Sequence, residues 1–273
     1  MVEIEPYTKI LWKSKRDREI WSRRIQEASR LYYYCEYRTF EIGLRDVIVY
    51  HLHLDDKLEQ SILTFNKHDI VFYPIRRSKM YSGFSHRHLS PSKNDPQFIY
   101  GCIAYRRNQD KAIKFYEASV DKVDHRTIGK LLGYPECCID FFVDNWSKVS
   151  IDPMYEIATN SEGATINDNR VELSVHPFTN QMLRYFGLRI TPHLPCSFTC
   201  ERTIELGKTW FEIMKEKDRT VANWLLDLLS METEWNCYKG ISIVDTPIFK
   251  GVTNSDSCLK KKIVTNLGWN GSV

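Results

Sequence analysis

The sequence predicts an α+β protein with a small sheet in a mixed N-terminal part and a mainly helical C-terminal part. Apolar residues recur at helical spacing over residues 14–37, whereas residues 45–54 alternate with the period of a half-buried strand. From residue 124 onward the pattern is mostly helical. We therefore expect an α+β part with a basic loop at residues 1–123 and a cysteine-bearing, mainly helical part at residues 124–273, which can also form one continuous domain.

The composition indicates a folded globular protein. The 273 residues are 42% hydrophobic, which is enough to bury a substantial core. A net charge of +3 lacks the basic excess of a dedicated nucleic-acid binder. The first fifteen residues carry Glu3 and Glu5 and no apolar run, and no later stretch is apolar enough for a membrane span. We expect a cytoplasmic protein without a membrane partner, whose cysteines are mostly thiols.

The elements of the N-terminal part follow from apolar spacing and turn residues. The stretch at 14–37 is typical of an amphipathic surface helix. After the strand at 45–54, the expected elements are a helix at 58–65, a strand at 69–75 ended by Pro74, a long loop at 76–96 and a strand at 98–105.

The strand at 45–54 places two histidines on one face. His51 and His53 alternate with apolar residues, and Asp55 follows, so these three side chains offer imidazole and carboxylate ligands to a metal. The alternative is the polar face of an amphipathic strand. We favour the alternative because the spacing places only the two histidines on one face and does not fix a third ligand beside them.

Basic residues are concentrated between Arg76 and Lys130. This stretch contains twelve basic and five acidic residues, a local net charge of +7, and aromatic residues are interleaved. We expect Arg76, Arg77, Arg106 and Arg107 to bind an anionic partner, either a small molecule such as a nucleotide or a nucleic acid. A solvated lysine-rich face explains the lysines equally well.

Capping residues predict the helices of the C-terminal part. Asp124 suits the start of a helix that ends near Leu132, Gly133 suits its left-handed end, and Pro135 suits the first turn of a helix reaching Trp146. The later elements expected are a loop at 150–171, helices at 180–186, 199–215 and 222–229, and strands at 241–244 and 248–252.

Four of the eight cysteines occur as two close pairs, each introduced by a proline. Cys137 and Cys138 follow Pro135 in the first turn of one helix, and Cys196 and Cys200 follow Pro195 at the start of another. A helix N-terminus stabilises a thiolate, which is the form that binds metal. Short cysteine spacings in a chain without an export signal indicate metal-thiolate or redox chemistry rather than a disulfide scaffold.

The spacing of the pairs bears on which metal they hold. Cys196 and Cys200, four residues apart, can share one helix face. Cys137 and Cys138 are adjacent and project about 100° apart on a helix, which is awkward for a single zinc ion and suits the separate iron corners of a cubane. We therefore expect an iron-sulfur cluster held by all four thiolates, with structural zinc as the alternative. A metal-free dithiol and four buried packing thiols are the further alternatives.

Two motifs carry a family resemblance. The first runs Leu132-Gly133-Tyr134-Pro135-x-Cys137-Cys138-x-x-Phe141-Phe142, and the second His193-x-Pro195-Cys196-Ser197-x-x-Cys200. Together they resemble an uncharacterised prokaryotic family, the domain-of-unknown-function 483 family, over about the C-terminal half of the chain. The resemblance implies that the two cysteine pairs belong to one constellation, and it implies no reaction.

These observations favour a metal-thiolate protein that is an enzyme modifying a nucleotide, nucleic acid or other anionic substrate. His193 and His176 are the candidates for catalysis, because each lies close to a proline-containing turn near the cysteines. The alternative is a non-catalytic binding protein stapled by zinc or a cluster. A helix-turn-helix around Gly133 is disfavoured, because Glu136 and two aspartates on the second helix would repel phosphates.

Overall fold

The chain forms two compact units in a computed structural model. Unit one comprises residues 1–36 and 144–273, and unit two comprises residues 37–143. The boundary expected from the sequence, after residue 123, lies inside unit two. The structure describes residues 9–51, 58–82, 85–89, 100–120, 123–146, 152–238, 241–254 and 261–273.

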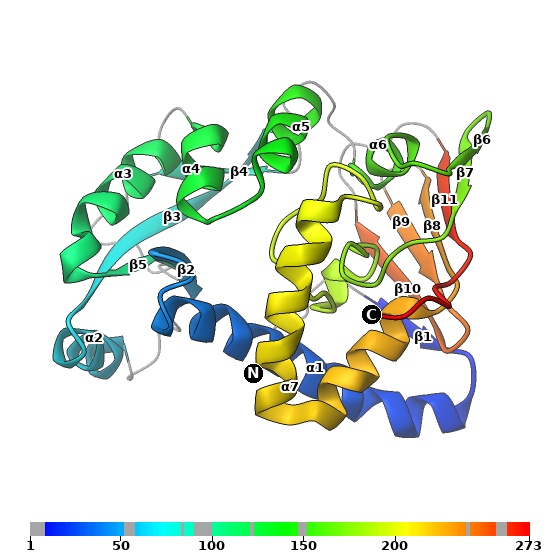
Figure 1. Cartoon of the computed structure of the whole chain (residues 1–273), viewed down its shortest axis with the longest axis horizontal. Helices are drawn as coiled ribbons and strands as arrows, with labels where there is room; N and C mark the ends of the chain where they lie inside the picture. The colour runs from blue at the N-terminus through cyan, green and yellow to red at the C-terminus, as the bar shows by residue number, and fades with distance from the viewer. Residues whose placement is uncertain are drawn as a thin grey trace. The chain divides into compact units, whose positions relative to one another are not determined.

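Helices and strands are mixed along the described chain, which confirms the α+β class (Figure 1). The α-helices are α1 (Lys15–Glu41), α2 (Leu58–Lys67), α3 (Gln109–Ser119), α4 (His125–Leu131), α5 (Glu136–Trp146), α6 (Met154–Thr159) and α7 (Glu201–Ser230). Two 3-10 helices are η1 (Arg106–Asn108) and η2 (Arg184–Phe186). The strands are β1 (Lys9–Trp12), β2 (Val47–His51), β3 (Ile70–Ser82), β4 (Ser85–Leu89), β5 (Tyr100–Tyr105), β6 (Thr165–Asn167), β7 (Arg170–Leu173), β8 (Thr233–Tyr238), β9 (Ile241–Asp245), β10 (Phe249–Asn254) and β11 (Lys262–Asn266).

Unit two is built on a four-stranded antiparallel sheet in the order β2-β5-β3-β4. Val47 and Ile48 of β2 are buried in two different clusters, so both faces of this strand are covered. Helix α3 contributes Phe115 to the cluster around Val47, and α2 contributes Phe65 to the cluster around Ile48. The alternation predicted for residues 45–54 is therefore present in β2, but the described strand is buried on both faces rather than on one.

Residues 76–82 and 85–89 belong to the paired strands β3 and β4, where the sequence pattern predicted part of a long loop at 76–96. Strand β3 continues through Pro74 and pairs with β4 beyond it. Pro74 lies opposite Gly101 of β5, and a Cβ atom at Gly101 would lie 2.5 Å from the carbonyl oxygen of Tyr73. A glycine therefore allows β5 to approach β3 closely here, and the proline does not end the strand.

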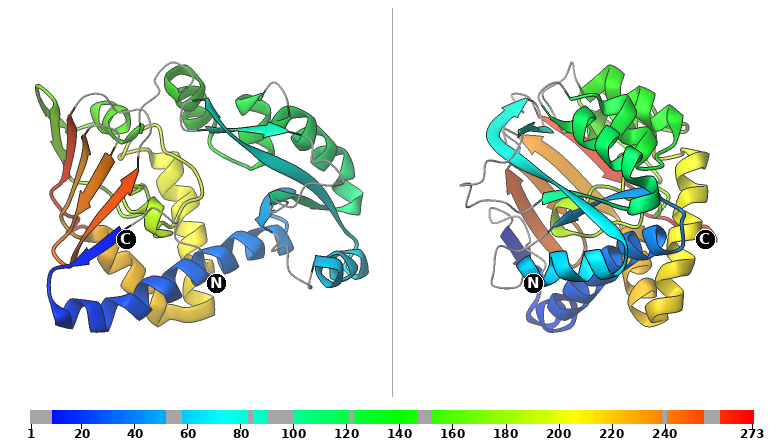
Figure 2. Two further views of the ribbon diagram at one scale, coloured as in Figure 1. Left: turned by 180° about the vertical axis from the view of Figure 1, so that it is seen from behind. Right: turned by 90° about the vertical axis from the view of Figure 1, so that its left-hand side faces the viewer.

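Unit one contains a seven-stranded sheet in the order β1-β10-β9-β8-β11-β7-β6. Neighbouring strands are antiparallel except β11 and β7, which are parallel. Strand β1, from the start of the chain, pairs with β10 near its end (Figure 2). The two strands predicted at 241–244 and 248–252 correspond to β9 and β10. The C-terminal part therefore carries more strand than the sequence pattern indicated, beside the long helix α7.

Helix α7 joins the two helices predicted at 199–215 and 222–229. Its backbone departs from helical geometry at Asp218, with φ −157° and ψ 93°. The carboxylate of Asp218 accepts a hydrogen bond from the backbone N–H of Val221 at 3.0 Å, which caps the second half of the helix. Of the helices that the structure describes, none combines the length and the apolar character needed to cross a membrane.

Two stretches between residues 150 and 200 differ from the prediction. The expected loop at 150–171 contains α6 and the β6–β7 hairpin. The helix expected at 180–186 is reduced to the single turn η2. The side chain of Asn180 accepts a hydrogen bond from the N–H of Met182 and donates one to the carbonyl oxygen of Leu229 in α7. These side-chain bonds compete with helical backbone bonds, which is why a helical apolar pattern does not form a helix here.

Candidate metal centre

The first cysteine pair lies at the beginning of α5. Gly133 adopts φ +72° and ends the preceding helix α4, as predicted. The carbonyl oxygen of Pro135 accepts hydrogen bonds from the N–H groups of Cys138 and Ile139, both at 3.0 Å. Cys137 is half-buried and Cys138 is almost fully buried. Their sulfur atoms are 3.9 Å apart, so the two thiols lie next to each other in the first turn of the helix.

The second pair lies in a turn that precedes α7. The helix begins at Glu201, Cys200 is its N-cap residue, and the N–H of Cys200 donates to the carbonyl oxygen of Ser197. The predicted helix start at residue 199 and the predicted shared helix face of Cys196 and Cys200 are therefore wrong. The turn bond takes the N–H that a helical bond to Cys196 would need. Cys200 still lies at the positive end of the helix dipole, as expected.

Hydrogen bonds from the residues that follow α6 and from Thr179 hold the backbone of this turn. The side-chain amide of Asn160 donates to the carbonyl oxygen of Cys196 at 2.8 Å. The hydroxyl of Ser161 accepts from the N–H of Phe198 at 2.8 Å. Thr179 donates from its hydroxyl to the carbonyl oxygen of Phe198 at 2.6 Å. The backbone on both sides of the turn is therefore positioned by residues distant in sequence.

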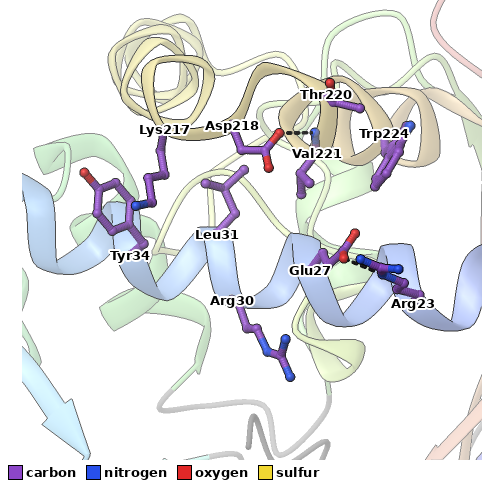
Figure 3. Close-up of a pocket in the computed structure, with 10 residues that line it drawn as sticks. All are labelled: Arg23, Glu27, Arg30, Leu31, Tyr34, Lys217, Asp218, Thr220, Val221 and Trp224. Atoms are coloured by element: carbon purple, nitrogen blue, oxygen red, sulfur yellow. Dashed lines mark hydrogen bonds and ion pairs between the residues drawn. The ribbon is translucent and has the colours of Figure 1, made fainter.

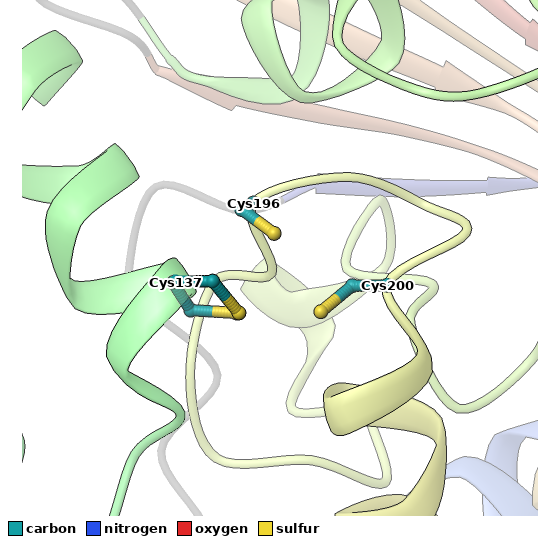
Figure 4. A group of neighbouring side chains, drawn as sticks. Cys137, Cys196 and Cys200 are labelled. Carbon is teal, nitrogen blue, oxygen red and sulfur yellow. The ribbon is translucent and has the colours of Figure 1, made fainter.

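The four cysteines form a cluster that can hold a metal ion. The sulfur atoms of Cys137, Cys138, Cys196 and Cys200 all lie within 4.8 Å of one another (Figure 4). Figure 4 shows the labelled side chains of Cys137, Cys196 and Cys200 directed toward a common point. Thiolate sulfur is the preferred protein ligand of zinc and of iron in such sites.

The spacing of the adjacent sulfurs overturns the argument that Cys137 and Cys138 suit a single zinc ion poorly. With zinc–sulfur bonds of about 2.3 Å, a regular tetrahedron places its sulfurs about 3.8 Å apart. The sulfurs of Cys137 and Cys138 are separated by 3.9 Å. The two side chains therefore converge, although their positions on the helix differ by one residue, because each χ1 rotamer can redirect its sulfur.

His193 is buried and bonded to α7. Its Nε2 atom lies 3.0 Å from the hydroxyl oxygen of Thr203, which is fully buried in the first turn of the helix. The bond connects the segment that leads into the cysteine turn with the helix that follows it. The role of His193 at a metal or in catalysis stays a prediction.

His176 is enclosed by aromatic rings. Its ring centroid lies 4.9 Å from that of Phe178 and 4.6 Å from that of Trp269. Its Nδ1 accepts a hydrogen bond from the N–H of Phe178. Burial, with a smaller contribution from the charge of Lys208, lowers the pKa of His176 to about 4. The ring is therefore neutral at pH 7, and its catalytic role also stays a prediction.

The four candidate arginines lie in two separate places in unit two. Arg106 donates from Nε to Asp69 at 3.0 Å, and the guanidinium of Arg107 lies 5.1 Å from the ring centroid of Tyr105. Tyr105 pairs with the first residue of β3, whereas Arg76 and Arg77 lie six and seven residues further along that strand. At about 3.3 Å per residue, the two pairs stand roughly 20 Å apart.

The other predicted metal ligands are described only in part. His51 ends β2 opposite Tyr100, and its side chain is outside the described part of the structure. His53 and Asp55 both lie outside the described residues. The hypothesis of a metal held by His51, His53 and Asp55 therefore stays a prediction.

A groove between α1 and α7 of unit one has a volume of about 560 Å³ (Figure 3). Arg23 donates to Glu27 at 2.7 Å, and the ammonium of Lys217 lies 4.7 Å from the ring centroid of Tyr34. The groove is lined by Arg23, Glu27, Arg30, Leu31, Tyr34, Lys217, Asp218, Thr220, Val221 and Trp224. Basic and acidic side chains nearly balance there, so the groove does not select a strongly anionic ligand.

Three residues that position the cysteine turn were not singled out from the sequence. Asn160 and Ser161 occur in a stretch expected to be a loop, and Thr179 precedes a helix that does not form. A run of Asn, Ser and Gly after a short apolar segment was the available signal, and it indicates a turn without naming its partner. Their function depends on hydrogen bonds to residues 19 to 37 positions away.

Comparison with family models supports the family resemblance. Neither a curated protein nor a solved structure is detectably similar to the chain. The range matched by a family model begins in β5 and ends in α7, so it includes both cysteine pairs, Arg106 and Arg107, but neither Arg76 nor Arg77. The resemblance predicted from the two motifs is confirmed: residues 102–223 match the family described as "Protein of unknown function (DUF483)".

Proposed function

We propose that Cys137, Cys138, Cys196 and Cys200 bind a single zinc ion, and that the protein is a zinc-stabilised binding protein. The observation that carries the proposal is the 3.9 Å separation of the Cys137 and Cys138 sulfurs, close to the edge of a zinc–thiolate tetrahedron. A cubane places its ligands on separate iron corners and spreads thiolate sulfurs further apart than a single ion does. The spacing therefore supports zinc over the iron-sulfur cluster expected first.

A site with four thiolates favours a structural role over catalysis. Four protein ligands complete the tetrahedron of zinc and leave no position for water or substrate. The two helix N-termini, at Cys137 and Cys200, stabilise the negative charge of the bound thiolates. The enzyme expected from the sequence is accordingly the less favoured of the two functions.

The partner that fits the arginines best is an extended polyanion. The backbone positions of Arg76 and Arg77 in β3 and of Arg106 and Arg107 in η1 are about 20 Å apart, which is too far for one mononucleotide, whereas several consecutive phosphates of a nucleic acid span that length. Arg106 and Arg107 are exposed in η1, where Arg106 is held by a surface ion pair worth little by itself. We infer that unit two contacts single- or double-stranded nucleic acid through these pairs.

Metal analysis of anaerobically purified protein tests the first part of the proposal. Zinc at one ion per chain, with no visible absorbance, is the expected result. Replacement of zinc by Co²⁺ should give the intense visible bands of a tetrahedral four-sulfur site. Brown protein that contains iron and sulfide would instead favour the cluster, and colourless protein without metal would contradict both.

A further inference from the structure

Arg45 is a buried arginine that lies just before β2 of unit two, with 6% of its surface exposed. Its backbone N–H donates to the carbonyl oxygen of Thr39 at 3.2 Å. The next residue, Asp46, accepts hydrogen bonds from the side chains of Asn108 and Lys111. The backbone at Arg45 is therefore held in place. A charged side chain is rarely buried unless its contacts offset the loss of hydration, so the groups that Arg45 contacts indicate its role.

The side chain of Arg45 contacts three consecutive residues in the turn between α4 and α5. Its Nε atom donates to the carbonyl oxygen of Leu132 at 3.0 Å, across 87 residues of sequence. A Cβ atom at Gly133 would lie 3.9 Å from the Cγ of Arg45, so the aliphatic part of the side chain lies against the backbone of that glycine. The guanidinium carbon lies 5.9 Å from the ring centroid of Tyr134.

The bond to Leu132 satisfies a group at the end of a helix. Leu132 is the C-cap residue of α4, and the last carbonyl groups of a helix have no partner within the helix. This end of a helix carries partial negative charge, which favours a cationic donor. The N–H groups of Gly133 and Tyr134 bond back to carbonyl oxygens of α4. Arg45 adds a bond from outside, so the turn is held from two directions.

The turn leads directly into the first cysteine pair. Only residues 132–135 connect α4 to α5, and Cys137 and Cys138 lie in the first turn of α5. A Cβ atom at Gly129 of α4 would lie 2.7 Å from the Cγ1 of Ile139, so the two helices are in close contact. Closely packed elements joined by a short turn have little freedom to absorb a displacement. A movement of the Leu132 carbonyl would therefore displace the start of α5 and with it the two sulfurs.

We propose that Arg45 is a positioning residue of the metal centre, which acts through the backbone of the turn before Cys137 and Cys138. This inference rests on the proposed zinc site. Groups that orient metal ligands typically change metal affinity without being ligands themselves. Arg45 lies outside residues 102–223, which match the family model, and outside both cysteine motifs. The contact with the turn is what assigns its role.

Zinc affinity of the full chain, measured by competition with a chelator, tests the proposal with two neutral substitutions. Arg45→Met keeps the length of the side chain as far as Nε and removes the donor, so it should weaken zinc binding by roughly 10- to 100-fold. Arg45→Gln places an amide N–H at the position of Nε and should recover most of this loss. Recovery by Arg45→Gln would connect the affinity to the bond with Leu132 rather than to side-chain volume.

Arg189→Met is the matched control. Arg189 of unit one also donates to a backbone carbonyl, that of Arg184, and its guanidinium lies 4.3 Å from the ring centroid of Tyr32. The control should lower the unfolding midpoint and keep zinc affinity. With Co²⁺ in place of zinc, the visible bands of a four-sulfur site should be unchanged in Arg189→Met and Arg45→Gln, and altered in Arg45→Met.

Equal zinc affinity and equal Co²⁺ bands in Arg45→Met and the unaltered protein would overturn the proposal while leaving the zinc site in place. Equal losses in Arg45→Met and Arg189→Met would also overturn it. If Arg45→Met does not fold, Tyr134→Leu removes the ring contact of the guanidinium, and unchanged zinc affinity there would contradict the proposal. An unaltered protein with an iron-sulfur cluster would refute the zinc site alone, and iron content should then follow the same order among the variants. An unaltered protein without metal would refute both.

Discussion

The side-chain amide of Asn160, at the end of α6, donates a hydrogen bond to the carbonyl oxygen of Cys196 at 2.8 Å. This bond acts on the backbone of a proposed metal ligand from 36 residues away. Groups that orient metal ligands in this way typically change metal affinity without contacting the metal.

Asn160→Ala should therefore weaken zinc binding by roughly 10- to 100-fold, measured by competition with a chelator. Glu162→Ala is the matched control, because only the backbone N–H of Glu162 is bonded to the turn, to Thr199. Equal affinity of the two variants would mean that the Asn160 bond does not position Cys196. Loss of zinc from both would indicate that the segment following α6 affects the fold more broadly.

Cys200→Ser should abolish stoichiometric zinc binding, because a three-thiolate site with a neutral hydroxyl holds the ion less tightly. Cys102→Ala should keep the metal. Burial raises the pKa of the Cys102 thiol to about 12, and its sulfur is bonded to the carbonyl oxygen of Ala112. Zinc content measured after gel filtration distinguishes the variants. Retention of zinc by Cys200→Ser would remove that residue from the ligand set.

Oligonucleotide binding should depend on both arginine pairs. Replacing Arg106 and Arg107 by Ala should weaken binding and make it less sensitive to salt, because fewer counterions are released. Replacing Arg76 and Arg77 should have a similar effect. For a mononucleotide, the effects of the two double substitutions on affinity should not add, because a mononucleotide cannot span about 20 Å. Arg23→Ala in unit one is the control, and salt-independent binding would exclude a nucleic-acid partner.

The stability of the protein should fall as the pH is lowered from about 6.5 to about 4. The folded state keeps His176 neutral, with its pKa lowered to about 4, whereas the unfolded state takes up a proton near pH 6.5. The contribution of His176 to the unfolding free energy is therefore complete above the pKa of the unfolded state, about 6.5, and is lost as the pH falls to the pKa of the folded state, about 4. The loss is at most about 3 kcal/mol before solvent screening. The difference in unfolding free energy between the unaltered protein and His176→Gln should become smaller as the pH is lowered across that range. A constant difference would contradict the prediction.

Gly207→Ala should destabilise unit one, although alanine favours a helix over glycine. A Cβ atom at position 207 would lie 2.5 Å from the Cβ of Phe178, so the segment carrying Phe178 must move. We expect a net loss of about 1 to 3 kcal/mol in denaturant unfolding, typical of overpacking. Lys208→Ala, next along α7, should change stability little, and a more stable Gly207→Ala variant would show that the contact can relax.

Local interactions are the part of this protein that the sequence by itself determined. Asp124 caps α4 with bonds to the N–H groups of Arg126 and Thr127, and Gly133 ends the helix with a positive φ. Each of these features depends on residues within about one helical turn, so the pattern carries the information. The cysteine spacing after prolines likewise indicated metal-thiolate chemistry, and the family resemblance implied that the two pairs belong to one constellation, before any distance was known.

Tertiary structure decided what depends on distant partners. Strand β3 passes through Pro74 because Gly101 of β5 allows the close approach, and the helix predicted at 180–186 is lost because Asn180 bonds to α7. The 3.9 Å separation of the Cys137 and Cys138 sulfurs likewise depends on side-chain rotamers, because the backbone positions of the two residues diverge. Periodicity and capping do not encode rotamers or long-range pairing, since both are selected by packing among residues far apart in the chain.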